Sequence, residues 1–257
     1  MRTALAVELL KMRRSRVVMV ATVVLVLLMP VLAAGFMAAY TLGGDSQLTA
    51  KVSTMVTGSS WADYLGLMGQ LLSVGALLAV GVVVSWVFGR EYSDGTVGSL
   101  YALPVTRARL AWAKGLVVLG WGLTVSVLAA VVAVPLGVMV GLDDPVSVGA
   151  VVRALAVPVA VAVLTTLLAL PFGLVASVGR GYLPAIGALL GVVVATQIMT
   201  VLGAGAWFPW AAPGLWSGMG GAALASSVTG VQLALPVLVG ALGLWATASW
   251  WTRAEVI

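Results

Sequence analysis

Residues 65–88 read LGLMGQLLSVGALLAVGVVVSWVF, a continuous stretch without a charged side chain. A helix needs about 20 mostly apolar residues to cross the hydrocarbon core of a bilayer. Three more uncharged runs of sufficient length cover 17–40, 115–142 and 154–179, and a much longer one covers 181–252. The repeated pattern predicts an all-α integral membrane protein.

The longest run exceeds what a single crossing needs and has to be divided. Its middle, 203–214, reads GAGAWFPWAAPG, where glycine and proline break helices and tryptophan favours the membrane interface. We therefore expect residues 203–229 to lie at the outer face or to dip back into it. Five spans, with the final stretch folded otherwise, is the alternative. The six expected spans cover about 17–40, 65–88, 110–141, 154–179, 183–202 and 230–251, in a single permease domain, 1–257.

The composition agrees with a lipid-facing surface. Of the 257 residues, 62% are hydrophobic and 8% are charged, whereas a soluble domain carries about 25% charged residues. The sequence has no cysteine and no histidine. Disulfides are therefore excluded, and the usual ligands for soft or borderline metals are missing, so no metal site is expected.

The distribution of basic residues predicts the orientation. If the N-terminus is cytosolic, 11 of the 13 lysines and arginines fall on the cytosolic side, and only Lys51 and Arg153 fall outside. This bias places both termini in the cytosol. The richness in alanine, valine, glycine and arginine, with only three lysines, indicates a bacterium, and we expect the chain in its inner membrane. A cleaved secretory signal is the alternative for the N-terminus, but the uncharged run extends to Tyr40, beyond the usual apolar core of about 7–15 residues.

The first 16 residues resemble an amphipathic helix at the inner interface. Leu5, Leu9 and Met12 fall on one face, and most of the basic residues fall elsewhere. A basic tail without this role is the alternative.

The expected spans carry no ionisable residue in their interiors. Such groups usually mark proton or ion coupling, so a secondary transporter, an intramembrane protease and a redox enzyme are all disfavoured. The most polar groups inside are hydroxyls and one amide, which either bond helix to helix or line a cavity for an amphiphile. These candidates for a substrate pathway are Thr165, Thr166, Thr196, Gln197 and Thr200.

The segment after the second span, 88–114, reads FGREYSDGTVGSLYALPVTRARLAWAK. Asp94-Gly95 favours a turn, and Asp94 or Thr96 can cap a short helix that ends before Pro104. The apolar side chains of that helix need a partner, either the membrane surface or a soluble subunit. Glu91 is expected to pair with a basic group of the partner, or with Arg90 or Arg107.

At this segment the sequence resembles the permease subunits of type-2 ABC exporters. That family has a glutamate after the second span, a Gly-Thr pair, an apolar helix, a proline, basic residues and a lysine opening the third span. The matching residues are Glu91, Gly95, Thr96, Leu100, Pro104, Arg107 and Lys114. The resemblance also covers the basic N-terminal helix, the six spans and the broken segment before the last span.

The resemblance implies a coupling helix that docks on a separate ABC ATPase. It assigns this role to Glu91, Asp94, Gly95, Thr96, Val97, Leu100, Tyr101, Leu103 and Pro104. It also implies two ATPase copies, a second permease half, and export of a drug, a peptide antibiotic or a lipid-like molecule. A non-transporting scaffold, immunity or sensor subunit that recruits an ATPase is the alternative.

The chain carries no phosphate-binding loop of the GxxxxGK[ST] type. We therefore expect a permease subunit without an ATPase site or a cofactor of its own. ATP and magnesium would bind to the partner subunit, and no nucleic acid is involved.

Overall fold

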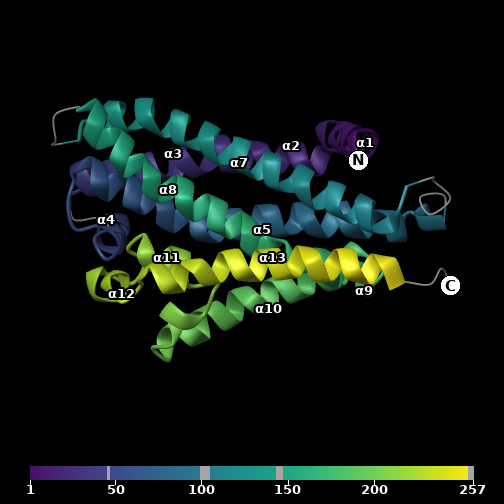
Figure 1. The fold of residues 1–257 in the computed structure, drawn as a ribbon. Helices are drawn as coiled ribbons and strands as arrows, with labels where there is room; N and C mark the ends of the chain where they lie inside the picture. Colours follow the sequence, from purple (N-terminus) through teal and green to yellow (C-terminus); the bar gives the residue numbers. More distant parts are fainter. Residues whose placement is uncertain (45–46, 99–104, 143–146, 254–257) are drawn as a thin grey trace.

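The computed structural model describes residues 1–44, 47–98, 105–142 and 147–253, and it forms an elongated helical bundle (Figure 1). Within these residues, six helical segments are long and apolar enough to cross a membrane, which confirms the six-span prediction. They are the composite first span α2 (Arg16–Val23), η1 (Val24–Leu28) and α3 (Met29–Leu42); α5 (Trp61–Ser93); α7 (Arg107–Val140); α8 (Val148–Ala169) continued by α9 (Pro171–Val178); α10 (Tyr182–Val201); and α13 (Gly230–Arg253).

Helix α5 lies at the centre of the bundle and is the most buried of the spans. Its close approach to α10 depends on Gly89, because a Cβ atom there would lie 2.5 Å from the backbone nitrogen of Tyr182. Helix α10 is the least buried span, and the apolar side chains of Leu190, Val194 and Ile198 are exposed. Exposed side chains of this kind face lipid or another membrane protein.

The two ends of the bundle differ in charge. The N-terminus, α1 (Arg2–Arg13), the start of α7 and the last residues of α13 lie at one end, which we call the basic end (Figure 1). The short helix α4 (Gln47–Val52), with α11 and α12, lies at the other, which we call the opposite end.

The segment between the fifth and sixth spans folds back against the bundle. It contains η2 (Gly205–Trp207), α11 (Ala212–Trp216) and α12 (Ala222–Ser226). The Trp210 indole donates a hydrogen bond to the Leu168 carbonyl of α8, at 3.1 Å. Gly214 packs on Ser73 of α5, whose Oγ would lie 2.8 Å from an added Cβ. The segment therefore packs on the bundle, and its expected place at the outer face of the membrane, or dipping back into it, stays a prediction.

Helix α1 presents a different face to the bundle from the one that its apolar residues suggest. Ala4, Glu8 and Met12 are buried, whereas Leu9 is 49% exposed and faces away. A carboxylate therefore lies at the centre of the buried face. The position of helix α1 at the membrane interface stays a prediction.

Candidate functional site

Four charged residues meet inside the basic end of the bundle. Glu8 and Lys11 come from α1, Glu91 from the last turn of α5, and Lys114 from the second turn of α7. We call these four residues the charge cluster. It joins three helices that are far apart in the sequence.

Lys114 is the centre of the cluster and is fully buried. Its Nζ donates hydrogen bonds to Glu8 Oε2 at 3.0 Å, to Glu91 Oε1 at 2.9 Å and to the carbonyl oxygen of Val87 at 3.0 Å, and Glu91 Oε2 lies 2.8 Å away. An ammonium group has three protons to donate, and three separate groups accept them here. Burial of a charge is tolerated only with such pairing, so the two carboxylates are what allow a lysine at this position.

Lys11 balances the second negative charge. Its Nζ lies 3.0 Å from Glu8 Oε1 and 2.9 Å from Glu91 Oε1, and its side chain is 27% exposed. Partial burial lowers the pKa of Lys11, but the charges of Glu8 and Glu91 and their hydrogen bonds outweigh it and hold the pKa above its ordinary value. The cluster thus has two positive and two negative charges and opens to solvent on the Lys11 side.

Two sequence-based expectations need correction here. The interior of the spans does contain an ionisable residue, because Lys114 lies within α7 and is fully buried. The strongest partners of Glu91 within the chain are Lys114 and Lys11 rather than Arg90, whose Nε is 3.9 Å from Glu91 Oε1. The sequence feature that could have indicated this charge cluster is Glu8, an acidic residue within an otherwise basic N-terminal segment.

The described part of the expected coupling segment begins directly beyond the cluster. Helix α5 ends at Ser93, Asp94 follows as its C-cap, and Gly95 has a positive φ of 68°, which is the turn conformation that favours glycine. The Thr96 N–H donates to the Glu91 carbonyl, at 2.9 Å. Val97 starts a new helical turn. The remaining residues assigned to coupling, Leu100, Tyr101, Leu103 and Pro104, lie outside the described residues.

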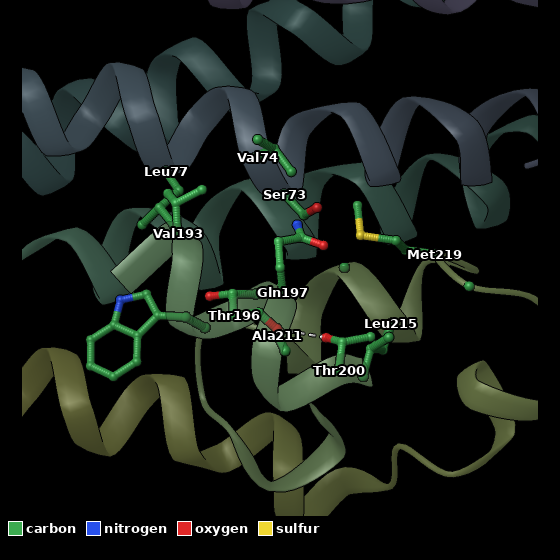
Figure 2. Close-up of a pocket in the computed structure, with 13 residues that line it drawn as sticks. Ser73, Val74, Leu77, Val193, Thr196, Gln197, Thr200, Ala211, Leu215 and Met219 are labelled. Atoms are coloured by element: carbon green, nitrogen blue, oxygen red, sulfur yellow. Dashed lines mark hydrogen bonds between the residues drawn. The ribbon is translucent and has the colours of Figure 1, made fainter. Parts of the chain in front are cut away.

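A cavity of about 200 Å³ lies between α5, α10 and the folded-back segment (Figure 2). Thr196, Gln197 and Thr200, three of the predicted pathway residues, line it together with Ser73 and Trp210. The remaining lining is mostly apolar, including Val74, Leu77, Val193, Ala211, Leu215 and Met219.

The polar groups of the cavity differ in what they can offer a ligand. The Thr196 hydroxyl donates to the Val192 carbonyl and the Thr200 hydroxyl to the Thr196 carbonyl, both at 2.8 Å. They therefore present acceptor lone pairs. Gln197 is exposed, and its amide carries both donors and an acceptor. This arrangement suits an apolar molecule with a small number of polar groups.

The other two predicted pathway residues lie elsewhere. Thr165 and Thr166 are buried in α8, and their hydroxyls donate to the carbonyls of Val161 and Ala162, at 2.7 and 2.8 Å. Thr166 also packs against Gly122 of α7. The structure thus separates the five residues into three at the cavity and two inside the helix packing.

The family comparison covers the charge cluster and part of the cavity. The profile of a family described as ABC-2 family transporter protein matches residues 4–197, which include α1 and most of the first five spans. The chain belongs to the ABC-2 transporter family. A search of curated proteins finds no match. This ABC-2 subunit is a multi-pass membrane protein and the transmembrane part of an ABC transporter that associates with an ATPase subunit.

The charge cluster lies within the part of this ABC-2 subunit that matches the family profile. All four cluster residues lie inside the matched region, as do Thr196 and Gln197 of the cavity. One helix, α5, contributes to both places: Ser73 and Leu77 line the cavity, and Glu91 lies in the last turn. From Leu77 to Glu91 the helix rises about 20 Å.

Proposed function

We propose that this ABC-2 subunit exports a hydrophobic or amphiphilic molecule from a bacterial cell, driven by a separate ATPase. The substrate class includes drugs, peptide antibiotics and lipid-like molecules. The single observation that carries the proposal is the continuity of α5, because one rigid helix lines the cavity and also ends at the charge cluster beside the expected coupling segment.

The coupling step follows from this continuity. ATP and magnesium bind to two copies of the ATPase subunit. When these two subunits close on each other, they move the segment between α5 and α7. The charge cluster links the ends of α5 and α7 to α1, so the three helices move together. Movement of α5 changes the width of the cavity at the other end of the helix, which is the class of rigid-body transition expected for such bundles.

The orientation and the assembly belong to the same proposal. The basic end faces the cytosol because 11 of the 13 lysines and arginines fall on the expected cytosolic side of the six-span topology, and α1 and the last described residues of α13 lie at that end (Figure 1). A second permease half, identical or related, packs against this one and completes the pathway. The exposed apolar side chains of α10 offer it a surface.

The cavity supports the substrate class. Its walls are apolar, and its polar groups in the described part are hydroxyls and amides without a formal charge. A neutral amphiphile can leave lipid for such walls without burying an unpaired charge, and a cationic one meets no positive side chain that would repel it. Small inorganic ions would find no replacement for their hydration shells.

The test is reconstitution with the ABC ATPase that co-purifies in mild detergent. Proteoliposomes should accumulate a fluorescent amphiphile when ATP is supplied on the side of the basic end, and the purified chain alone should bind no ATP. Gln197→Leu should change the apparent KM for the amphiphile, whereas Thr165→Val should leave it unchanged. ATP hydrolysis without movement of any amphiphile would favour the scaffold or immunity subunit.

A further inference from the structure

A second hollow lies between the first span and α5, and the proposed function does not use it. It is a groove of about 600 Å³. Val17, Val20 and Val24 form one wall, and Leu78 and Val82 form part of the other. Val20 is 60% exposed, so the groove opens sideways, where the bilayer lies.

The groove has two different ends. Met29 closes one end against Gly75, where an added Cβ would lie 2.6 Å from the Met29 sulfur. Arg16 stands at the other end, in the first turn of α2. Arg16 and Met29 are 13 positions apart, which corresponds to a rise of about 20 Å along the helix. The groove is therefore long, narrow and apolar, with a guanidinium at one end.

The guanidinium end lies at the level expected for lipid headgroups. Arg16 is exposed, and no ion pair to it is recorded among the described residues. On α5 beyond the groove lining, toward the basic end, the guanidinium of Arg90 lies 4.6 Å from the centre of the Trp86 ring. Tryptophan and arginine together are typical of the membrane–water interface. The exposed Arg13 and Arg14 add positive charge where α1 ends.

The charges decide between two kinds of occupant. A second copy of this chain seated in the groove would have to supply a carboxylate to Arg16. Among the described residues of the basic end, Glu8 and Glu91 are buried in the charge cluster, which leaves Asp94 as the exposed carboxylate. A two-fold contact at the groove would bring Arg13, Arg14 and Arg16 of both copies together with a single such carboxylate from each copy, so positive charge would be in excess. A phosphodiester supplies the missing negative charge, and an acyl chain matches the apolar walls.

We propose that this groove binds one anionic phospholipid, with an acyl chain between α2 and α5 and its phosphate at Arg16. Basic pockets between membrane helices bind anionic headgroups by this combination of charge and apolar contact. The bound lipid fills the space between the first span and α5.

The test counts the lipids bound to the purified chain without its ATPase, so its result does not depend on transport. The chain is titrated with dioleoyl phosphatidylglycerol or dioleoyl phosphatidylcholine, and adducts are counted by native mass spectrometry. We expect preferential retention of phosphatidylglycerol. Arg16→Gln should weaken that retention about fivefold. Arg14→Gln, which removes an exposed charge that does not line the groove, should weaken it less.

A second pair of variants tests the groove itself. Ala79→Phe fills the groove from α5 and should abolish retention of both lipids, and Val20→Trp fills it from α2 with the same result. Val127→Phe places similar bulk on an exposed position of α7 and should have no effect. Equal retention of the two lipids by the unmodified chain, or phosphatidylglycerol still bound to both filled variants, would overturn the proposal. So would a change from dimer to monomer on filling, since the occupant would then be a second copy.

Discussion

Lys114 of α7 and Glu8 of α1 are 106 residues apart in the sequence, and their side chains lie 3.0 Å apart inside the basic end. Within the part of the chain that the structure describes, Lys114 also pairs with the buried Glu91, and Glu8 also pairs with Lys11, whose side chain is 27% exposed. The N-terminal helix is therefore held to the second and third spans by an internal ion pair rather than by apolar contact alone.

Removal of Lys114 should strongly destabilise the bundle. Lys114→Met leaves two buried carboxylates with only Lys11 beside them, and breaking a buried pair in this way costs about 3–5 kcal/mol. Thermal unfolding in detergent should show a clear fall in Tm. Lys51→Met, which removes an exposed lysine at the opposite end, should change stability by no more than about 0.5 kcal/mol. Equal Tm values for the two variants would mean that the cluster is not a structural centre.

The contribution of Lys11 to stability should be constant near neutral pH and should be lost at the alkaline side. The pKa of Lys11 is raised in the folded protein, so its stabilising effect is fully present below the ordinary value of 10.5 and is lost as the pH rises through the folded pKa. The Tm difference between the unmodified chain and Lys11→Met should be constant from pH 7 to about pH 10 and then shrink. Lys11→Arg stays charged and should keep its Tm relative to Lys11→Met above that range. A difference that varies near neutral pH would contradict this assignment.

Leu100 should be needed for docking of the ATPase. The residue falls outside the described residues, and the prediction rests on the apolar pattern of the segment that follows Gly95. Leu100→Asp should abolish co-purification of the ATPase in mild detergent and leave membrane insertion intact. Leu48→Asp, on an exposed position of α4 at the opposite end, is the matched control and should retain the ATPase. Full transport by Leu100→Asp would place the docking surface elsewhere.

Gln197 should govern the preference for charged substrates. Gln197→Glu adds a carboxylate to a mostly apolar cavity and should lower the KM for cationic amphiphiles while raising it for anionic ones. Substrate-stimulated ATPase activity measures both. The same change at Thr124, exposed on α7 outside the cavity, should leave both KM values as they are. If Gln197→Glu behaves like the Thr124 variant, the cavity is not on the pathway.

Cysteine labelling should report the orientation without background, because the natural sequence has no cysteine. A cysteine at Ser147, before α8 at the opposite end, should react with an impermeant thiol reagent in intact cells. A cysteine at Ser93, at the end of α5, should react only after the cells are opened. The reverse pattern would place the basic end outside.

The spans were predictable because a charge-free run of sufficient length has few alternatives to a membrane helix. The cavity was predictable only in part. Thr165 and Thr196 have the same side chain at similar depth in uncharged runs, and hydropathy does not say which face of a helix turns inward or toward a neighbour. The pairing of Glu8 with Lys114 could be seen only in the structure, because the sequence pattern does not indicate which helices are neighbours. It gives no sign that the N-terminal helix packs beside the third span.

The sequence distance between Glu8 and Lys114 also sets an order for biosynthesis. Glu8 leaves the ribosome 106 residues before its buried partner does, and at about 5–20 residues per second this delay lasts roughly 5–20 s. During that time Glu8 has only Lys11, three positions along the same helix, to neutralise it. The first helix to be made therefore reaches its final place only after the third span has been inserted, so the bundle can be completed at its basic end only then.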